Sequence, residues 1–265
     1  MTLVLRFAAL LLGATVLTAS AHADESTAAK GLAIATASQD RDKGFGSSRS
    51  VAKMILRDRS GTANVRDFTA LALEVQSDGD QTSIEFDTPL DVRGMTVLTH
   101  AHKAGDDDQW LYLPAASRTR RITSGSRTGS FAGSEFSYED LVGATVDKYS
   151  YNYLRDEACP GAADRMCFVN EQRPKDQESG YSRMVAWVDT QDYRGYKVEY
   201  YDRGGALMKT LVSSDFRLFE NKYLRPMKML MTNHINGKST EMQWASYDFK
   251  VRLTPEQMAP HSLGK

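Results

Sequence analysis

The sequence lacks several features that would place it in a common protein class. Beyond its first 23 residues it has no apolar run near the roughly 20 residues that a membrane-spanning helix needs. Basic residues are not in excess, because 33 lysines and arginines stand against 34 aspartates and glutamates, whereas nucleic-acid binders usually carry a basic surplus. We therefore expect a protein that neither spans a membrane nor binds nucleic acid.

The motifs of common enzyme classes are also missing. The sequence has no G-x-S-x-G turn of the kind that a serine hydrolase of the α/β type needs. Gly44 and Gly46 are not followed by the third glycine or the lysine of a phosphate-binding loop. We expect no catalytic residue, no metal and no cofactor. The alternative is an envelope hydrolase or metal protein centred on His100 and His102, which a strand would place on one side.

The N-terminus has the three regions of a secretory signal peptide. Arg6 precedes an apolar run over residues 7–17, and small residues then lead to Ala23. We predict cleavage after Ala23, so that residues 1–23 form the signal peptide and residues 24–265 form one exported domain. Position 24 is Asp and not Cys, which predicts that no lipid anchor is attached there.

Only two cysteines are present, Cys159 and Cys167, and they lie in a segment with turn-forming residues. Because an exported protein meets an oxidising compartment, we expect them to form a disulfide that fixes a loop. The alternative is a pair of free thiols.

The residue pattern predicts a mainly β protein with few helices. An Ala-rich stretch over residues 26–42 is typical of an amphipathic helix, with Leu32, Ile34, Ala35 and Ala37 on one side. A short helix over residues 138–142 and a last helical turn from Thr254 are also expected. Alternating segments predict strands over residues 50–57, 65–74, 82–88, 95–102, 109–113, 118–122, 147–154, 167–172, 184–189, 196–201, 207–218, 224–233 and 238–252.

Strands in this number, joined by short turns, indicate one long antiparallel sheet. Strongly twisted open sheets seldom exceed about ten strands, so this sheet must curl or close. Curling produces a concave face. If the helices cover that face, the space beneath them is a natural ligand chamber.

Large apolar residues recur at every second position on several strands. Met227, Met229 and Met231 share one face, as do Met242 and Trp244 on the next strand. Methionine is flexible and polarisable, so it suits contact with ligands of variable shape. The same residues are equally consistent with a packed core between the sheet and its helices.

The most distinctive run is Trp110-Leu111-Tyr112-Leu113-Pro114, followed by the basic segment 118–122 and the Phe- and Gly-containing segment 131–141. This run resembles the bacterial outer-membrane lipoprotein-sorting proteins, distant relatives of the periplasmic carrier LolA. The later run Tyr201-Asp202-Arg203-Gly204-Gly205 and the segments 223–226 and 244–247 also fit that group. The resemblance extends over residues 52–253.

The resemblance implies a fold and a function. The fold is a LolA/LolB-like half-barrel, a strongly curved and unclosed antiparallel sheet with helices as a lid over an apolar cavity. The function is that of a periplasmic carrier that binds the acyl chains of a lipoprotein or lipid and shuttles them towards an acceptor at the outer membrane. An alternative role is a non-enzymatic accessory or interaction protein of an inner-membrane lipid exporter of the resistance-nodulation-division (RND) type.

Two groups of site residues follow from the pattern and the resemblance. Arg118, Arg120, Arg121 and Arg127 are candidates for contact with anionic head groups or a partner, or for plain pairing with nearby carboxylates. The Gly-rich loop over residues 123–137 is a candidate lid. The predicted lining of the cavity and lid comprises Ile84, Phe86, Met95, Val97, Trp110, Tyr112, Phe131, Phe136, Met227, Met229, Met231, Met242 and Trp244.

Overall fold

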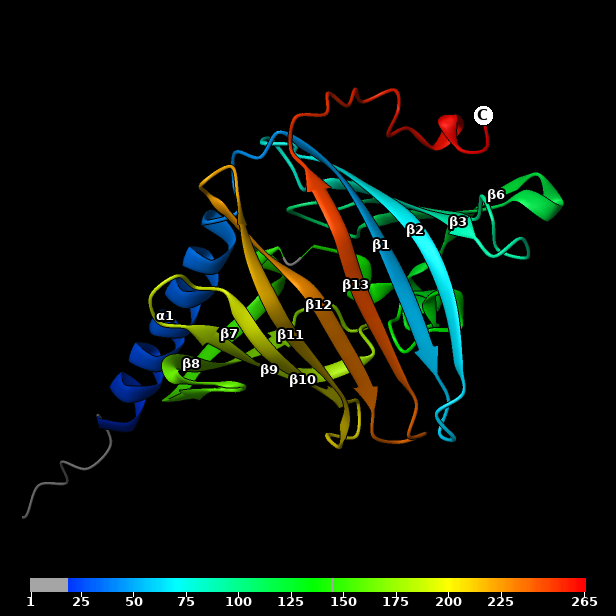
Figure 1. Ribbon diagram of the computed structural model, residues 1–265. Helices are drawn as coiled ribbons and strands as arrows, with labels where there is room; N and C mark the ends of the chain where they lie inside the picture. Colours follow the sequence, from blue (N-terminus) through cyan, green and yellow to red (C-terminus); the bar gives the residue numbers. More distant parts are fainter. Residues whose placement is uncertain (1–18, 144) are drawn as a thin grey trace, which may run out of the picture.

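A single antiparallel sheet of thirteen strands dominates the computed structural model, which describes residues 19–143 and 145–265 (Figure 1). The signal-peptide prediction lies largely outside these residues. All thirteen predicted strands are present. Their bounds are β1 Ser47–Arg57, β2 Ala63–Leu73, β3 Gln81–Thr88, β4 Thr96–His100, β5 Asp108–Leu113, β6 Arg118–Ile122, β7 Tyr149–Cys159, β8 Ala162–Pro174, β9 Tyr181–Asp189, β10 Gly195–Asp202, β11 Leu207–Phe219, β12 Tyr223–Asn233 and β13 Ser239–Asp248.

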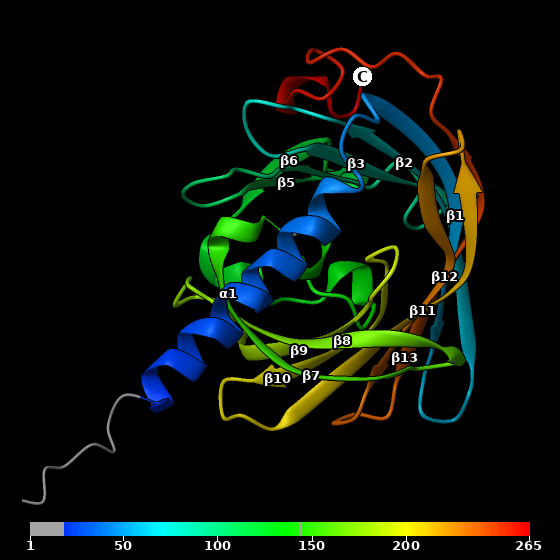
Figure 2. The same ribbon diagram turned by 90° about the vertical axis from the view of Figure 1, so that its left-hand side faces the viewer.

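The strand order shows how the sheet is built. It runs β6-β5-β4-β3-β2-β1-β13-β12-β11-β10-β9-β8-β7, so the first and last strands pair in its middle. The edges β6 and β7 are not paired with each other, and the sheet is therefore curved but not closed into a barrel (Figure 2). This confirms the predicted half-barrel.

The register gathers the large apolar residues on the inner face. Met54 pairs with Met242, and Phe68 pairs with both Ala52 and Phe86. Residues that pair directly across a ladder point to the same face, so these side chains form one continuous apolar surface. The main apolar cluster of the protein lies on this surface.

Helix α1 spans Ala19–Asp40, beginning earlier than the predicted bound, and packs against β7 and β8. Its contact face is built by Gly31, Ile34 and Ser38, and the Ser38 hydroxyl donates to the Tyr193 carbonyl at 3.0 Å. Leu32, expected on the inner side, is 47% exposed, because residues spaced by three and four share a helix face and the face against the sheet is that of Gly31, Ile34 and Ser38. None of the helices in the described residues is long and apolar enough to cross a membrane.

The remaining helices are short 3₁₀ turns. The predicted helix over residues 138–142 is one such turn, and the predicted turn near Thr254 is followed by another. A lid made of several helices is therefore not what covers the sheet. The 3₁₀ turns are Pro114–Ala116, Ser124–Ser126, Phe131–Gly133, Glu139–Leu141, Val146–Lys148 and Pro260–Ser262.

The C-terminal segment lies against the outer face of the sheet. His100 Nε2 is 2.6 Å from the Met258 carbonyl oxygen, and the Met258 side chain is fully buried. The Trp110 ring packs edge-on to the His100 ring at 5.0 Å, and Gly264 lies directly against the ring of Tyr112. This face of β4 and β5 is thus covered by the chain itself.

The predicted disulfide between Cys159 and Cys167 is confirmed. It joins the last residue of β7 to an internal residue of β8, close to the turn between the two strands, and both cysteines are buried. Val169, Val185 and Trp187 pack around it as a second apolar cluster.

Candidate functional site

The segment that joins the two edges of the sheet is the most unusual part of the inner face. Because β6 and β7 lie at opposite edges, the chain between them must return across the hollow of the sheet. Figure 2 shows its 3₁₀ turns inside the curve, with α1 in front of them. This segment brings its own apolar side chains to the inner face.

Residues Ser130–Ser137 of this segment form a small hairpin, which we call the plug hairpin. Ser130 and Ser137 make an isolated β-bridge, and the Phe131 amide donates to the Phe136 carbonyl at 2.7 Å. Ala132 and Gly133 turn the chain with φ values of 50° and 72°. The turn holds the two phenylalanine side chains close together at the inner face of the sheet.

Phe131 and Phe136 fill the middle of the hollow. They are 0% and 4% exposed. The Phe131 ring lies 5.5 Å from the Phe86 ring and 6.0 Å from the Tyr138 ring. Aromatic pairs at these distances stabilise their contact by about 0.5–1.5 kcal/mol beyond burial. The predicted lid is therefore inserted into the sheet and is part of its core in this structure.

Polar contacts fasten the tip of the plug hairpin to the strands. The Arg66 guanidinium donates to the Ala132 carbonyl, and the Glu135 amide donates to the Thr240 hydroxyl at 3.0 Å. Asn233 donates its side-chain amide to the Glu135 carboxylate at 2.7 Å. These contacts join the hairpin to β2, β12 and β13 without any strand ladder.

A buried ion pair anchors the segment just after the hairpin. Lys209 on β11 pairs with Asp140, and the two side chains are 3% and 2% exposed. Asp140 also accepts hydrogen bonds from the Tyr181 hydroxyl and the Ser137 amide, each at 2.7 Å. Burial, together with the negative charge of Asp140, raises the pKa of Tyr181 far above its ordinary range. Tyr181 therefore stays a neutral donor at any physiological pH.

Glu139 adds a second buried carboxylate beside this anchor. Burial raises its pKa, while hydrogen bonds from the Ser179 hydroxyl and the Gly180 amide act in the opposite direction. Glu139 also lines a pocket of about 440 Å³, together with charged residues that include Arg127, Lys148 and Asp176. We interpret its role as holding the segment to the turn before β9.

Most of the predicted lining residues come together. They belong to or pack against one apolar cluster, with Met54 and Met184, which the sequence prediction did not include. Met227, two residues before Met229 on β12, is also buried but is not part of the cluster. Those that meet in the cluster are Ile84, Phe86, Met95, Val97, Phe131, Phe136, Met229, Met231, Met242 and Trp244.

Trp110 and Tyr112 are placed differently. The register pairs Val97 with Leu111 and Leu98 with Trp110, so Trp110 points to the face opposite the cluster. Tyr112 shares that face and lies under Gly264. Alternation identified two faces on β5 correctly but not which of them is interior.

The four predicted head-group arginines do not form one site. Arg121 pairs with Asp108, and Arg127 is 8% exposed and pairs with Asp176 at 2.6 Å. Arg118 and Arg120 are exposed on the edge strand β6. The histidines that were considered as metal ligands also have separate partners, since His102 contacts Asp78 at 2.6 Å whereas His100 contacts Met258.

Comparison with known proteins places this architecture in a family. A family model described as "Uncharacterized protein" matches residues 78–265, which is more than half of the chain. No curated protein matches the sequence. A DUF1329 family protein from Desulfovibrio piger is 28% identical with a TM-score of 0.83, covering 89% of this chain and 99% of that one.

Two further solved structures define the fold and the family. A LolA superfamily protein from Nitrosomonas europaea is 18% identical with a TM-score of 0.70, over 89% of this chain and 99% of its own, and shows the fold. A domain from Vibrio parahaemolyticus, described as an outer membrane lipoprotein-sorting protein, is 43% identical with a TM-score of 0.87, over 90% of this chain and all of its own. The chain thus belongs to the outer membrane lipoprotein-sorting protein family and has its LolA-like fold.

Proposed function

We propose that this protein is a periplasmic carrier that binds the acyl chains of a lipoprotein or lipid against its inner face and shuttles them towards the outer membrane. The proposal rests on the plug hairpin, whose two phenylalanines occupy an apolar surface that the sheet itself builds. The signal peptide and the family are consistent with a periplasmic location. Neither the fold nor the relatives support the alternative role as an accessory protein of an RND-type exporter.

An acyl chain can replace the plug hairpin only if its burial free energy exceeds that of the two phenylalanine side chains. Withdrawing two phenylalanine side chains from the core costs roughly 3–6 kcal/mol, at about 1.5–3 kcal/mol for each. An acyl chain with about 12 buried methylenes gains roughly 10 kcal/mol, at about 0.8 kcal/mol for each. Burial of apolar surface alone therefore favours the acyl chain over the plug, and the cost of association, roughly 4–15 kcal/mol, acts against it.

The composition of the inner face suits a guest of variable shape. Met54, Met229, Met231 and Met242 lie in the apolar cluster beside the phenylalanines. Methionine side chains have three rotatable bonds and fill irregular gaps, so they can close around chains of different length or saturation. A rigid wall of β-branched residues would favour a single ligand shape.

The test is to loosen the plug hairpin without removing apolar surface. Arg66→Gln removes the contact between the guanidinium and the Ala132 carbonyl. Since the bound state requires the plug to leave, weakening its fastening lowers the cost of binding and raises the apparent affinity. We expect Arg66→Gln to bind a dansyl-labelled fatty acid several-fold more tightly than the wild type, as measured by fluorescence titration.

Arg57→Gln is the matched control, because Arg57 lies on the neighbouring strand and pairs with Glu241 away from the plug hairpin. Its affinity should equal that of the wild type. Lipid extraction and native mass spectrometry of the protein from its own host provide the independent readout. Repeated absence of bound lipid, together with no fatty-acid binding by either protein, would contradict the carrier role.

A further inference from the structure

The sheet is split along part of one internal seam. The ladder between β12 and β13 runs only from the pair Lys228–Gln243 to the pair Thr232–Ser239. Both strands continue beyond Lys228 and Gln243 and stay paired on their other sides, β12 with β11 and β13 with β1. The two backbones therefore separate beyond this pair. Packed aromatic rings fill the far end of the gap, where Tyr223 stacks on Phe249 at 4.8 Å. The near end, beside Met227 and Trp244, is an open pocket, which we call the slot.

The sequence explains why the two strands separate here. Pro226 has no amide hydrogen to donate to a ladder, and proline is confined to edges or irregular points of sheets. Asp215 on β11 has a φ of 55° and is left out of the ladder opposite Met227. Strained residues of this kind gather at functional sites, where surrounding structure holds them in place.

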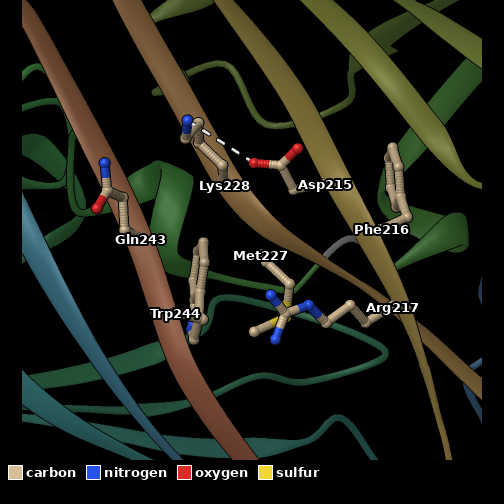
Figure 3. Close-up of a pocket in the computed structure, with 7 residues that line it drawn as sticks. All are labelled: Asp215, Phe216, Arg217, Met227, Lys228, Gln243 and Trp244. Atoms are coloured by element: carbon tan, nitrogen blue, oxygen red, sulfur yellow. Dashed lines mark ion pairs between the residues drawn. The ribbon is translucent and has the colours of Figure 1, made fainter.

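The slot is open to solvent, and polar side chains form most of its surface. Its volume is about 490 Å³. Met227 and Trp244 face each other across it, and the guanidinium of Arg217 extends towards them (Figure 3). Lys228 and Gln243 complete the rim, and Lys228 is 3.7 Å from the exposed Asp215.

Trp244 belongs both to the slot and to the apolar surface of the interior. Trp244 packs against the central apolar cluster, and the neighbouring pair Met229–Met242 belongs to that same surface. A molecule with a polar end at the rim and an apolar chain directed inward would therefore follow a continuous apolar path. Ala245 and Ser246, exposed beside the slot, are too small to close it.

We propose that the slot binds the head-group end of a single-chain anionic amphiphile, with its carboxylate or phosphate between Arg217 and Lys228 and its first methylenes on Met227 and Trp244. This inference rests on the carrier role and specifies the ligand class. Arginine offers a planar fork of donors to such an anion, and lysine adds a point charge. The pair between Lys228 and Asp215 is exposed and therefore weak, so an anion can replace Asp215.

The experiment compares three probes that share one apolar chain: dodecanoate, dodecyl phosphate and uncharged dodecanol. Calorimetric titration of the full wild-type chain should show at least one anion binding roughly tenfold more tightly than dodecanol, the effect of a hydrogen bond to a charged group. The Arg217→Gln/Lys228→Gln variant should lose this preference while keeping its affinity for dodecanol. The anion that binds more tightly identifies the head group.

Arg203→Gln/Lys238→Gln is the matched control, because it removes two cations from turns outside the slot. It should keep the wild-type preference. Equal binding of anions and dodecanol by the wild type, or a preference that survives in the slot variant, would overturn the head-group site and leave the carrier role intact. Failure of all three probes to bind would overturn both.

Discussion

Lys209 and Asp140 form an ion pair from which solvent is almost completely excluded, with side chains 3% and 2% exposed. The rings of Tyr181 and Tyr200 each lie 5.2 Å from the lysine ammonium and complete its enclosure. Burial raises the pKa of Tyr200 well above its ordinary value. Asp140 follows the plug hairpin directly, and Lys209 belongs to β11. The pair therefore fastens the segment between β6 and β7 to the C-terminal half of the sheet.

Removing one partner of this pair should be strongly destabilising. Lys209→Met leaves the Asp140 carboxylate buried without its cation, a change that costs roughly 3–5 kcal/mol. Urea unfolding followed by circular dichroism measures the loss. Lys43→Met, which breaks an exposed pair with Asp40, should cost no more than about 1 kcal/mol. Similar losses for the two variants would contradict the role of the buried pair.

The disulfide should contribute a modest part of the stability. Cys159 and Cys167 are separated by 8 positions. Closing a loop of this length reduces the entropy of the unfolded chain and raises the free energy of unfolding by roughly 2–3 kcal/mol. We expect Cys159→Ala/Cys167→Ala to lose about this amount in denaturant unfolding. Wild-type protein treated with a reductant should then unfold at the same denaturant concentration as the variant. An unchanged midpoint would show that the hairpin is fixed by packing alone.

Stability should depend on pH through His102. Hydrogen bonding to Asp78, with a second contact to Asp108, raises the pKa of His102 above 6.5. A raised pKa in the folded state means that this contribution is complete below pH 6.5 and is lost as the pH rises through the folded-state value. The wild type should therefore exceed His102→Gln in unfolding free energy by more at pH 5 than at pH 9.

The acid side of this profile has the opposite sign. The hydrogen bond with His102 lowers the pKa of Asp78 from 3.8 to about 2, so its contribution is lost as the pH falls from 3.8 towards 2. His261→Gln is the control, since His261 is exposed on the C-terminal segment. A difference between wild type and His102→Gln that does not change with pH would contradict this assignment.

Gly31 should be intolerant of even one added carbon. In an isolated helix Gly→Ala gains about 1 kcal/mol. Here a Cβ would lie 2.8 Å from Asn170 Oδ1 and 2.9 Å from the Tyr153 amide nitrogen, so α1 would have to move away from the sheet. We expect Gly31→Ala to lose roughly 1–3 kcal/mol in thermal or urea unfolding. The exposed Thr36→Ala on the same helix should lose nothing, and a stabilised Gly31→Ala would refute the close contact.

The strands could be predicted from sequence because their signals are local. Alternation identifies a strand without reference to its neighbours, and residues such as Gly61 mark the turns between strands. The disulfide was predictable because its two cysteines are only eight positions apart and exported proteins meet an oxidising compartment. Met229 and Met231, which the period of two placed on one face, meet in the apolar cluster, whereas Met227 lines the slot.

The remaining features depend on contacts between distant parts of the chain. Trp110 was predicted to lie in the interior, but the face that it shares with His100 is covered by Met258, which is 158 positions from His100 in the sequence. The pairing of Lys209 with Asp140, 69 positions apart, has no local signature. The slot forms where the ladder between β12 and β13 ends, and Pro226 is the one local sign of that interruption in the sequence of β12.

The pairing of β1 with β13 at the centre of the sheet has a consequence for biogenesis. The six N-terminal strands can form local hairpins as soon as they are free to fold, but their half cannot join the other until β13 is available. Until then β1 and β12 present bare backbone edges, which are templates for aggregation. Assembly of the sheet is thus completed by its last strand, and a chain shortened by its last thirty residues would leave two halves that cannot join.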